Sequence, residues 1–392
     1  MVADAALRVA EAVQASLPDL VNLADGLHAE PELGFEEYRS AEAVASMLER
    51  HGFAVERGIA GMETAFRATR GSGELHLALM AEYDALPEVG HACGHNLIAA
   101  SAVGAGIALA AVADELDLTI EVLGTPAEEG GGGKVLMIDA GLFDRVHAAM
   151  MAHPWSFDRL SSACLAVDHF DVEFSGRTAH ASAAPDQGVN AADAMVIAQV
   201  AMGLLRQQLA PGDQIHGIVT LGGEAANVIP AKVTGRFMCR STSISALDAL
   251  RPRVDACFQA GALATGCELV VTELAPAYSH MEQDEELLAA YRRHAEARGR
   301  QFALDDEGAP EPTYSTDMAN VSLVVPSIHP LIGIETQGAV NHQPEFAAAC
   351  TGPSAETALL DAATSLALTG VDAARTPHLR ERLLAKTRQG AS

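Results

Sequence analysis

Two short apolar runs with a longer apolar stretch between them constrain the fold of this chain most. Leu75–Met80 and Thr119–Leu123 have the character of buried strands, and the Ala- and Gly-rich segment Leu97–Val112 has the length of a helix. A helix that connects two such strands is typical of a parallel sheet covered on both faces. The sequence therefore predicts an α/β fold with a mostly parallel sheet flanked by helices. Further helices are predicted before the first strand, over Pro18–Glu30 and Ser40–His51.

A second pattern begins near Asp168. Its segments alternate as strand, helix, strand, strand, helix and strand, and they are His169–Ser175, Asn190–Gln207, Ile215–Leu221, Val233–Arg240, Ser245–Ala264 and Cys267–Glu273. The order βαββαβ is that of a ferredoxin-like module, which can fold on its own. We predict an inserted lid or dimerisation domain over residues 168–276, within a discontinuous catalytic domain over residues 1–167 and 277–392. Helical character resumes at Glu285–Arg298, and Val321–Val325 and Pro353–Leu368 are expected to return the chain to the catalytic domain.

Composition excludes several classes of function. A chain of 392 residues, 49% hydrophobic and 20% charged, is long enough for two globular domains. Its 25 basic and 52 acidic residues give a net charge of −27, and no basic block is present, so nucleic acid is not an expected partner. The first residues lack a signal-peptide pattern, and the longest apolar run is too short and too rich in Gly to span a bilayer. We expect a cytoplasmic protein without a membrane partner, and its six scattered cysteines are expected to be reduced thiols.

Cysteine and histidine side chains lie two residues apart in a glycine-containing loop after the first strand. In Gly90-His91-Ala92-Cys93-Gly94-His95-Asn96, Cys93 and His95 can turn toward one point, because glycine lets the backbone approach closely. A buried structural cysteine beside a surface histidine is the alternative. Thiolate and imidazole are ligands that zinc-like divalent metals prefer. The pair therefore predicts a metal site, provided that further ligands converge on it.

Those further ligands are expected after the next strands. Glu128 and Glu129 follow the strand Thr119–Leu123, in Thr125-Pro126-Ala127-Glu128-Glu129 before a run of glycines. Neighbouring side chains on an extended loop point in different directions, so one carboxylate can bind metal while the other faces the substrate water. His153 follows the apolar segment Ala148–Met151. A solvated glutamate pair and a core histidine are the alternatives, and the joint pattern favours a metallohydrolase.

Several motifs in order along nearly the whole chain resemble the aminoacylase and carboxypeptidase family of dinuclear metallo-amidohydrolases. They are the Cys93–His95 motif, Glu82-Tyr83-Asp84-Ala85-Leu86-Pro87, Pro126-Ala127-Glu128-Glu129-Gly130, Gly176-Arg177-Thr178-Ala179-His180-Ala181 and Asn227-Val228-Ile229-Pro230. The branch resembled includes hippurate hydrolase, indole-acetyl-amino-acid hydrolase and aminobenzoyl-glutamate hydrolase. Asn96, where much of this branch has Asp, and Tyr83, where Met is common, are features of a subgroup that includes dipeptidases.

The resemblance implies a role for each matching residue. It implies Cys93, His95, Glu129, His153 and His342 as metal ligands, with Cys93 bridging two ions, and Glu128 as the general base. His329 competes with His342 for the last ligand position. Asp84 matches a carboxylate that lies close to the metals. The inserted domain would contribute His180 and Asn227, which act on the scissile carbonyl, and Arg240, which holds the substrate carboxylate.

The implied reaction is metal-dependent hydrolysis of the amide bond of an N-acyl or N-aminoacyl amino acid. Two divalent ions, zinc or manganese with cobalt or nickel as alternatives, would activate a bridging water, and Glu128 would take its proton and pass it to the leaving amine. His180 would reach the site from the second subunit of a homodimer. A dipeptidase on an unusual dipeptide or an aminobenzoyl-glutamate-type substrate is the alternative on the same scaffold. A catalytically silent metal-binding scaffold is the alternative of another class, and retention of Glu128 disfavours it.

Overall fold

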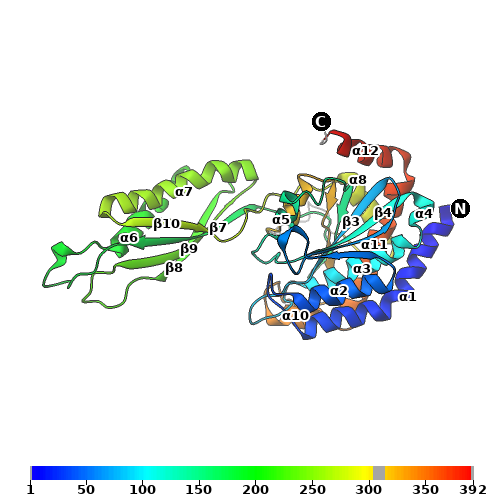
Figure 1. The fold of residues 1–392 in the computed structure, drawn as a ribbon, viewed down its shortest axis with the longest axis horizontal. Helices are drawn as coiled ribbons and strands as arrows, with labels where there is room; N and C mark the ends of the chain where they lie inside the picture. The colour runs from blue at the N-terminus through cyan, green and yellow to red at the C-terminus, as the bar shows by residue number, and fades with distance from the viewer. Residues whose placement is uncertain (1, 303–313, 390–392) are drawn as a thin grey trace. The chain divides into compact units, whose positions relative to one another are not determined.

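The structure is a computed structural model that describes residues 2–302 and 314–389. The chain divides into two compact units (Figure 1). The second unit comprises Cys164–His280 with Tyr314 and Ser315, and the first comprises the described residues before and after it. The sequence-based boundaries at residues 168 and 276 remain predictions.

The first unit is built on a sheet with the strand order β1-β2-β4-β3-β5-β11. β3 pairs in parallel with β4 and with β5, and β11 pairs in parallel with β5, whereas the β1–β2 and β2–β4 pairs are antiparallel. A separate short sheet pairs β6 with β12 in parallel. The strands are β1 (Ala54–Arg57), β2 (Phe66–Gly71), β3 (Leu75–Glu82), β4 (Leu118–Thr125), β5 (Ala148–Met150), β6 (His153–Trp155), β11 (Ser327–Ile328) and β12 (Leu331–Gly333).

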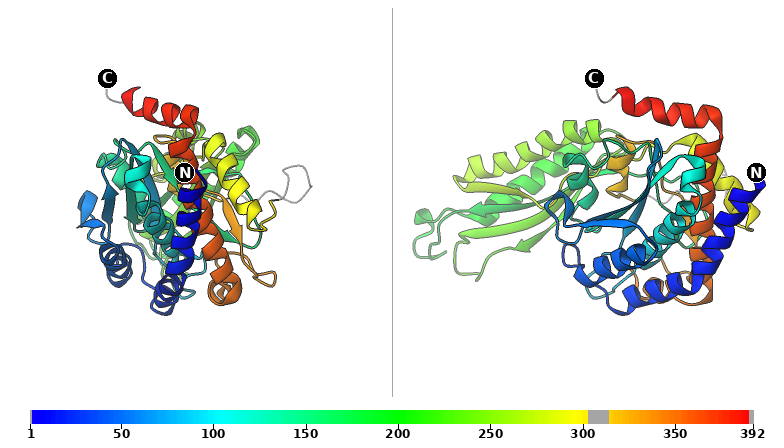
Figure 2. Two further views of the ribbon diagram at one scale, coloured as in Figure 1. Left: turned by 90° about the vertical axis from the view of Figure 1, so that its right-hand side faces the viewer. Right: turned by 45° about the vertical axis from the view of Figure 1, so that its right-hand side comes forward.

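Helices cover both faces of this sheet. Alternate residues of β3 belong to different apolar clusters: Leu77 and Leu79 pack into the one that includes α1, α3 and α11, and Ala78 and Met80 into the one that includes α5 and α9. Figure 2 shows α1 and α11 side by side. The helices of this unit are α1 (Val2–Ala29), α2 (Tyr38–Arg50), α3 (His95–Ala110), α4 (Ala113–Leu116), α5 (Gly133–Asp139), α8 (Glu285–Ala297), α9 (Met318–Ser322), α10 (Pro344–Ala349), α11 (Pro353–Arg375) and α12 (Pro377–Gln389), with a 3₁₀ turn η1 (Ile59–Gly61). The predicted α/β architecture is confirmed.

Small residues let α3 lie in the centre of the unit. Every residue from His95 to Leu109 is buried. A Cβ atom at Gly104 would lie 2.7 Å from Leu20 Cδ1, and one at Gly106 would lie 2.5 Å from Val122 Cγ2. Because glycine has no side chain, α3 approaches α1 on one side and β4 on the other. The apolar run of the sequence is therefore a core helix, and its first residue carries a candidate ligand.

The second unit has the predicted βαββαβ order. Its antiparallel sheet has the strand order β10-β7-β9-β8. Phe170, Val172 and Phe174 of β7 face an apolar cluster formed with α6 and α7, so the helices cover one face of the sheet (Figure 1). The elements are β7 (Ala166–Ser175), η2 (Pro185–Gln187), α6 (Ala191–Leu205), η3 (Arg206–Gln208), β8 (Gln214–Leu221), β9 (Lys232–Ser241), α7 (Ile244–Thr265) and β10 (Glu268–Glu273).

One element differs from the sequence-based expectation. Helix α1 begins at Val2 and not at Pro18, because Ala5, Val9 and Val13 continue its buried stripe at a spacing of four residues. Residues Val321–Val325 lie in the first unit, where they form the end of α9 and a following turn. The first helix is therefore much longer than predicted, and Pro18 lies inside it.

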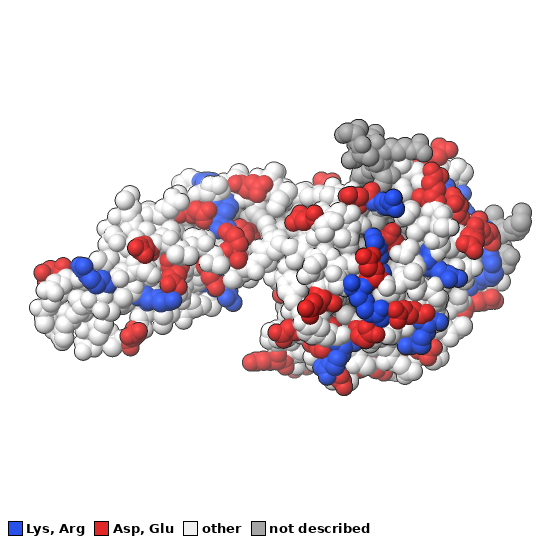
Figure 3. All heavy atoms as spheres, in the orientation of Figure 1, with Lys and Arg blue, Asp and Glu red and all other residues white. Residues whose placement is uncertain are grey.

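Charged side chains of both signs are interspersed on the face of the first unit drawn in Figure 3. Arg57 pairs with Glu42 and Glu49, and Arg67 pairs with Glu56. Further basic groups of this unit also have acidic partners. Among the described residues, no helix has the length and apolar character that crossing a membrane requires.

Candidate metal centre

The candidate ligands lie beyond the carboxyl ends of three neighbouring strands. Cys93 and His95 follow β3, Glu128 and Glu129 follow β4, and His153 follows β5. Because these strands are parallel, their carboxyl ends meet at one edge of the sheet, where open α/β sheets bind their ligands. The fold thus explains why residues separated by up to 60 positions come together.

Gly94 shapes the loop that carries the first pair. Its φ is +80°, in the left-handed region, and a Cβ atom there would lie 2.8 Å from Pro154 Cγ. Only glycine adopts this conformation readily and leaves room for the proline ring. Cys93 and His95 therefore flank a position that the structure reserves for glycine, and His95 is the first residue of α3.

Two histidines present the same nitrogen to the cluster. The Nδ1 atom of His95 lies 2.9 Å from the Asp84 carbonyl oxygen and 3.1 Å from Asp84 Oδ1. The Nδ1 atom of His153 lies 2.8 Å from the Pro154 carbonyl oxygen. These acceptors place the ring proton on Nδ1 and leave Nε2 as a lone-pair donor, which is how metal-binding histidines are commonly oriented. His153 Nε2 lies 3.6 Å from Cys93 Sγ.

The potential ligand atoms form overlapping groups. Within each group the atoms lie no more than 4.8 Å apart, and the groups are Cys93 with His95 and His153, Cys93 with Glu129 and His342, and His95 with Glu128 and Glu129. Cys93 belongs to two of them, an arrangement that suits a thiolate shared by two ions. The predicted residues Cys93, His95, Glu128, Glu129, His153 and His342 are therefore brought together.

The two late histidines occupy different places. His342 Nε2 lies 3.7 Å from Glu129 Oε2 and 3.8 Å from Cys93 Sγ, and its side chain is 59% exposed. Its backbone has a φ of 71°, in the left-handed region, and its N–H donates a hydrogen bond to the Ala92 carbonyl. His329 is buried, and its ring packs 5.3 Å from that of His153. The geometry favours His342 as the fifth ligand of the proposed centre.

Buried groups of like charge crowd this cluster. Burial raises the pKa of Glu128 well above its usual value, and the carboxylates of Glu82 and Glu129 raise it further. Burial also raises the pKa values of Glu129 and of the Cys93 thiol. The atoms His95 Nε2 and Glu129 Oε1 are buried without a hydrogen-bond partner. Nitrogen and oxygen lone pairs without a hydrogen-bond partner therefore lie among carboxylates whose negative charge is only partly balanced. Divalent cations would bind these lone pairs and neutralise this charge, so the residues present fit such ions.

Asp84 contacts two of the candidate ligands, His95 and Glu129. Its side chain is buried, Oδ1 lies beside His95 Nδ1, and Oδ2 accepts a hydrogen bond of 2.9 Å from the Glu129 N–H. Burial acts to raise the pKa of Asp84, but the nearby His95 and the Glu129 N–H outweigh it and hold that pKa below its usual value. The structure therefore places Asp84 where it orients one candidate ligand and the backbone of another.

A buried ion triad beside the cluster was not predicted from the sequence. Lys134 Nζ lies 2.6 Å from Asp317 Oδ1 and 2.6 Å from Glu82 Oε1, and all three side chains are fully buried. The Lys134 N–H also donates to Asp317 Oδ2 over 2.9 Å. A single lysine inside the otherwise apolar segment after the glycine run was the available signal. Its partners come from 52 positions upstream, on β3, and 183 positions downstream, next to α9, so the sequence could not indicate them.

The remaining predicted residues lie in the second unit. Segments around His180 and Asn227 pair, because the Ala181 N–H donates to the Asn227 carbonyl and the Ile229 N–H to the Ala179 carbonyl. His180 is exposed, and its Nδ1 accepts hydrogen bonds from the N–H groups of Ser182 and Ala183. Arg240 donates through Nη1 to Ser315 Oγ and through Nε to His216 Nε2.

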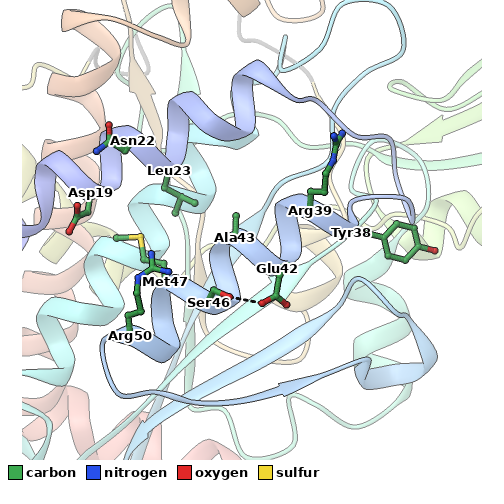
Figure 4. Close-up of a pocket in the computed structure, with 10 residues that line it drawn as sticks. All are labelled: Asp19, Asn22, Leu23, Tyr38, Arg39, Glu42, Ala43, Ser46, Met47 and Arg50. Atoms are coloured by element: carbon green, nitrogen blue, oxygen red, sulfur yellow. Dashed lines mark hydrogen bonds between the residues drawn. The ribbon is translucent and has the colours of Figure 1, made fainter.

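A shallow groove elsewhere on the first unit lacks such chemistry. It has a volume of about 700 Å³ and lies between α1 and α2 (Figure 4). Two of its charged residues already have partners: Arg39 pairs with Glu30 and Glu32, and Glu42 pairs with Arg57. None of the predicted site residues lines it.

Comparison with known proteins decides the family. The sequence model of the peptidase family M20/M25/M40 matches residues 78–361. The chain belongs to this family. The Xaa-Arg dipeptidase of Mus musculus is 37% identical over 388 residues, which cover 95% of this chain and 90% of that protein. One polypeptide of the p-aminobenzoyl-glutamate hydrolase of Escherichia coli K12 is 32% identical over 65% of this chain and 57% of that protein.

Solved structures of this family share the fold. A dinuclear metal-binding M20 peptidase of Bacillus subtilis has a TM-score of 0.67 with 22% identity, covering 91% of this chain and 98% of that one. An aminobenzoyl-glutamate utilization protein of Klebsiella pneumoniae has a TM-score of 0.69 with 20% identity over 92% and 98% of the two chains. The resemblance stated from the motifs is confirmed. This M20 family member is a metal-dependent hydrolase of amide or peptide bonds.

The structure gives physical reasons for two departures from the M20 branch pattern. Asn96 is buried, and its Nδ2 donates to the carbonyl oxygens of Ala24 over 3.3 Å and Cys350 over 3.0 Å, bonds that an ionised Asp lacks the hydrogens to make. Tyr83 is also buried; its ring stacks on Phe66 and its hydroxyl donates to the Thr64 carbonyl. Both residues thus serve packing contacts inside the first unit.

Proposed function

We propose that this M20 enzyme hydrolyses the amide bond of an N-acyl or N-aminoacyl amino acid with Glu128 as general base and then general acid. The observation that carries the proposal is the position of Glu128. Its Oε2 lies 3.7 Å from His95 Nε2, within one of the candidate ligand groups, while Glu129 supplies the carboxylate of a second group that includes Cys93 and His342. A purely structural metal site has no need for an additional buried carboxylate at this place.

In this proposal two divalent ions would be held by Cys93, His95, Glu129, His153 and His342. Zinc or manganese suits this set of thiolate, imidazole and carboxylate ligands, and cobalt or nickel are alternatives. Such ions, when bound, would lower the pKa of the attacking water and polarise the substrate carbonyl. Asp84 keeps His95 in the tautomer that leaves Nε2 free, through the 3.1 Å contact between Asp84 Oδ1 and His95 Nδ1.

Glu128 moves the proton in both halves of the reaction. It takes a proton from the attacking water and delivers it to the amine nitrogen, because an amide nitrogen leaves poorly as an anion. In the proposal the buried position of Glu128 next to Glu129 keeps its carboxylate within reach of both the attacking water and the amine nitrogen. Proton transfer by a positioned side chain contributes about 10²- to 10⁴-fold to the rate.

His180 and Asn227 bind the substrate carbonyl in the proposal. Since Nδ1 of neutral His180 accepts backbone hydrogen bonds, its ring proton lies on Nε2, which makes this atom a hydrogen-bond donor. A donor aimed at a developing oxyanion stabilises the transition state by about 3 kcal/mol. Asn227 lies on the paired segment and adds an amide donor.

Arg240 binds the substrate carboxylate. Its hydrogen-bond partners are a hydroxyl and an imidazole, and among the described residues it forms no ion pair with a carboxylate. Burial lowers the pKa of this guanidinium, which reflects the cost of a poorly compensated cation. A carboxylate ligand would offset that cost through bidentate hydrogen bonds. This requirement supports an amino-acid moiety as the leaving half of the substrate.

A dipeptidase is the second candidate within this class. It is favoured by the 37% identity to an Xaa-Arg dipeptidase over 95% of this chain. The substrate would then be a dipeptide whose carboxyl-terminal residue is basic. A free amine on the acyl half distinguishes this substrate from an N-acyl amino acid.

We also propose a homodimer formed through the second unit. Val196, Val200 and Leu204 project from α6 at a spacing of four residues and are 56%, 57% and 70% exposed. β8 is an edge strand of the sheet in this unit and exposes Val219 by 40% and Leu221 by 38%. An apolar helix stripe and a free strand edge in one unit suit a second copy of the same surface. Val200→Asp should yield monomers in light scattering, whereas Leu263→Asp, at an 87% exposed position on α7, should leave the assembly unchanged.

The first experiment is a substrate panel of N-acyl amino acids and dipeptides, including dipeptides with a basic second residue. Purified enzyme is stripped with a chelator and reloaded with zinc or manganese, beside Glu128→Gln and the control Glu11→Gln on exposed α1 surface. We expect metal-dependent amine release that Glu128→Gln lowers about 10²- to 10⁴-fold and that the control retains. A rate of turnover that neither the chelator nor Glu128→Gln lowers would refute the assignment of the site. No turnover on any substrate would favour the silent scaffold.

A further inference from the structure

The two oxygens of the Glu82 carboxylate have different neighbours inside the first unit. Its Oε1 lies 2.6 Å from the Lys134 ammonium. Its Oε2 is buried without a hydrogen-bond partner and lies 3.6 Å from His95 Nε2, the atom assigned to metal binding. Glu82 Oε2 is therefore as close to that nitrogen as Glu128 Oε2 at 3.7 Å and Glu129 Oε1 at 3.9 Å.

Three carboxylates thus surround one candidate ligand atom. Glu129 and Glu128 have roles in the proposed reaction, but Glu82 has none. An additional carboxylate on an ion would occupy a coordination position that water or the substrate carbonyl needs, since catalytic sites keep such a position open. Something must hold Glu82 away from the ions.

We propose that Lys134 is a positioning residue whose ammonium holds Glu82 beside the metal centre and keeps its carboxylate from binding a metal ion. This inference rests on the proposed function, because it assumes that ions bind at Cys93, His95 and Glu129. Lys134 contacts Glu82 and is itself held in position by Asp317. Its ammonium and its own N–H bind the two oxygens of Asp317 over 2.6 and 2.9 Å, so the side chain and the start of α5 are anchored together.

The positive charge of Lys134 also favours keeping Glu82 away from the metal ions. It is a fully buried cation, and its partners Glu82 and Asp317 are fully buried as well. A buried ion pair that loses one partner leaves an uncompensated charge, which is strongly unfavourable. Without the ammonium, Glu82 would gain most by turning its charge to a divalent ion. The centre would then bind metal more tightly and catalyse more slowly.

The test measures metal binding separately from turnover. Zinc content per subunit and zinc affinity, by competition with a chromophoric chelator, are determined together with kcat and KM for Lys134→Met, Glu82→Gln and the double variant. Lys232→Met is the matched control, since Lys232 is 55% exposed in a surface pair with Glu173. Changes next to metal ligands typically alter affinity or activity by about 10- to 100-fold.

We expect Lys134→Met to bind zinc about tenfold more tightly and to lose about 10- to 100-fold in kcat with a smaller change in KM. The added Glu82→Gln substitution should return zinc affinity to the wild-type value, because an amide is a poorer zinc ligand than a carboxylate. Glu82→Gln alone should keep two ions per subunit. Lys232→Met should match the wild type in every measurement.

Other results overturn the inference. Unchanged or weaker zinc binding by Lys134→Met would mean that the lysine acts only in folding, and loss of an ion in Glu82→Gln would mean that Glu82 is itself a ligand. If Lys134→Met does not fold, the same comparison is made with Asp317→Asn added, which removes the carboxylate left unpaired, and the Glu82→Gln measurement stands by itself. A wild-type protein that binds no zinc or manganese would instead refute the proposed function.

Discussion

Replacing Asn96 by aspartate should destabilise the protein strongly at neutral pH, although Asp resembles the pattern of the related branch. Asn96 is fully buried, and its Nδ2 donates to two carbonyl oxygens, of Ala24 on α1 and of Cys350 after α10. An ionised carboxylate at this place would donate nothing and would face two acceptors. The carboxyl group will therefore be protonated in the folded state, with its pKa raised far above the usual value.

The cost can be worked out from these contacts. A protonated aspartic acid in place of Asn96 can keep one of the two hydrogen bonds, so the loss is about 1 kcal/mol. Holding the proton at pH 7, against an unfolded pKa of about 3.9, costs about 4 kcal/mol more. The variant should lose about 5 kcal/mol of unfolding free energy at pH 7.

The pH dependence of this stability loss tests the prediction. Above a pH of about 3.9 the unfolded state releases a proton that the folded variant keeps, so the loss grows by about 1.4 kcal/mol per pH unit until the folded pKa is reached. Urea unfolding of wild type and Asn96→Asp at pH 6, 7 and 8, in the presence of a chelator, measures this difference. Asn22→Asp, on the exposed side of α1, is the control. A loss below about 1 kcal/mol, or one independent of pH, would show that the Asn96 contacts are assigned wrongly.

Three more outcomes are expected. Gly94→Ala should cost about 1–3 kcal/mol of stability and weaken zinc binding, because position 94 has a φ of +80° and a Cβ would meet Pro154 at 2.8 Å; thermal unfolding with and without zinc measures both, and unaltered zinc binding would contradict the role of this turn. Burial, with a contribution from Asp84, raises the pKa of Glu37 from 4.5 to about 7. Since the folded state then keeps a proton that the unfolded state releases, the contribution of Glu37 to wild-type stability should fall by up to about 3 kcal/mol as pH rises from about 4.5 to about 7, and Glu37→Gln should remove this part of the slope in urea titrations; an equal slope in both proteins would speak against it. Removal of metal by a chelator should lower Tm, because ligand binding to the folded state at a thousandfold excess over Kd stabilises it by about 4 kcal/mol; a Tm that ignores the chelator would argue against ions at Cys93.

The fold class and most of the candidate site were accessible from the sequence because their signals are local. Buried strands appear as short apolar runs, and the residues that follow parallel strands gather at one sheet edge. This is why Cys93, Glu129 and His153 could be proposed as a group before their contacts were known. The start of α1 was missed because Ala5, Val9 and Val13 form a weak stripe of small residues, interrupted by Pro18.

Contacts between distant segments were decided only by the tertiary structure. The sequence offered both His329 and His342 as candidates, and packing places His342 beside Cys93 while His329 packs against His153. Nothing local linked Lys134 to Glu82 and Asp317, because the three groups come from separate elements and meet only when β3, α5 and α9 pack. Motifs thus determine which chemical groups the chain has and where along it they stand. The packing of remote elements determines which of them share a buried environment, and hence which carboxylate can serve as ligand, base or partner of an ammonium.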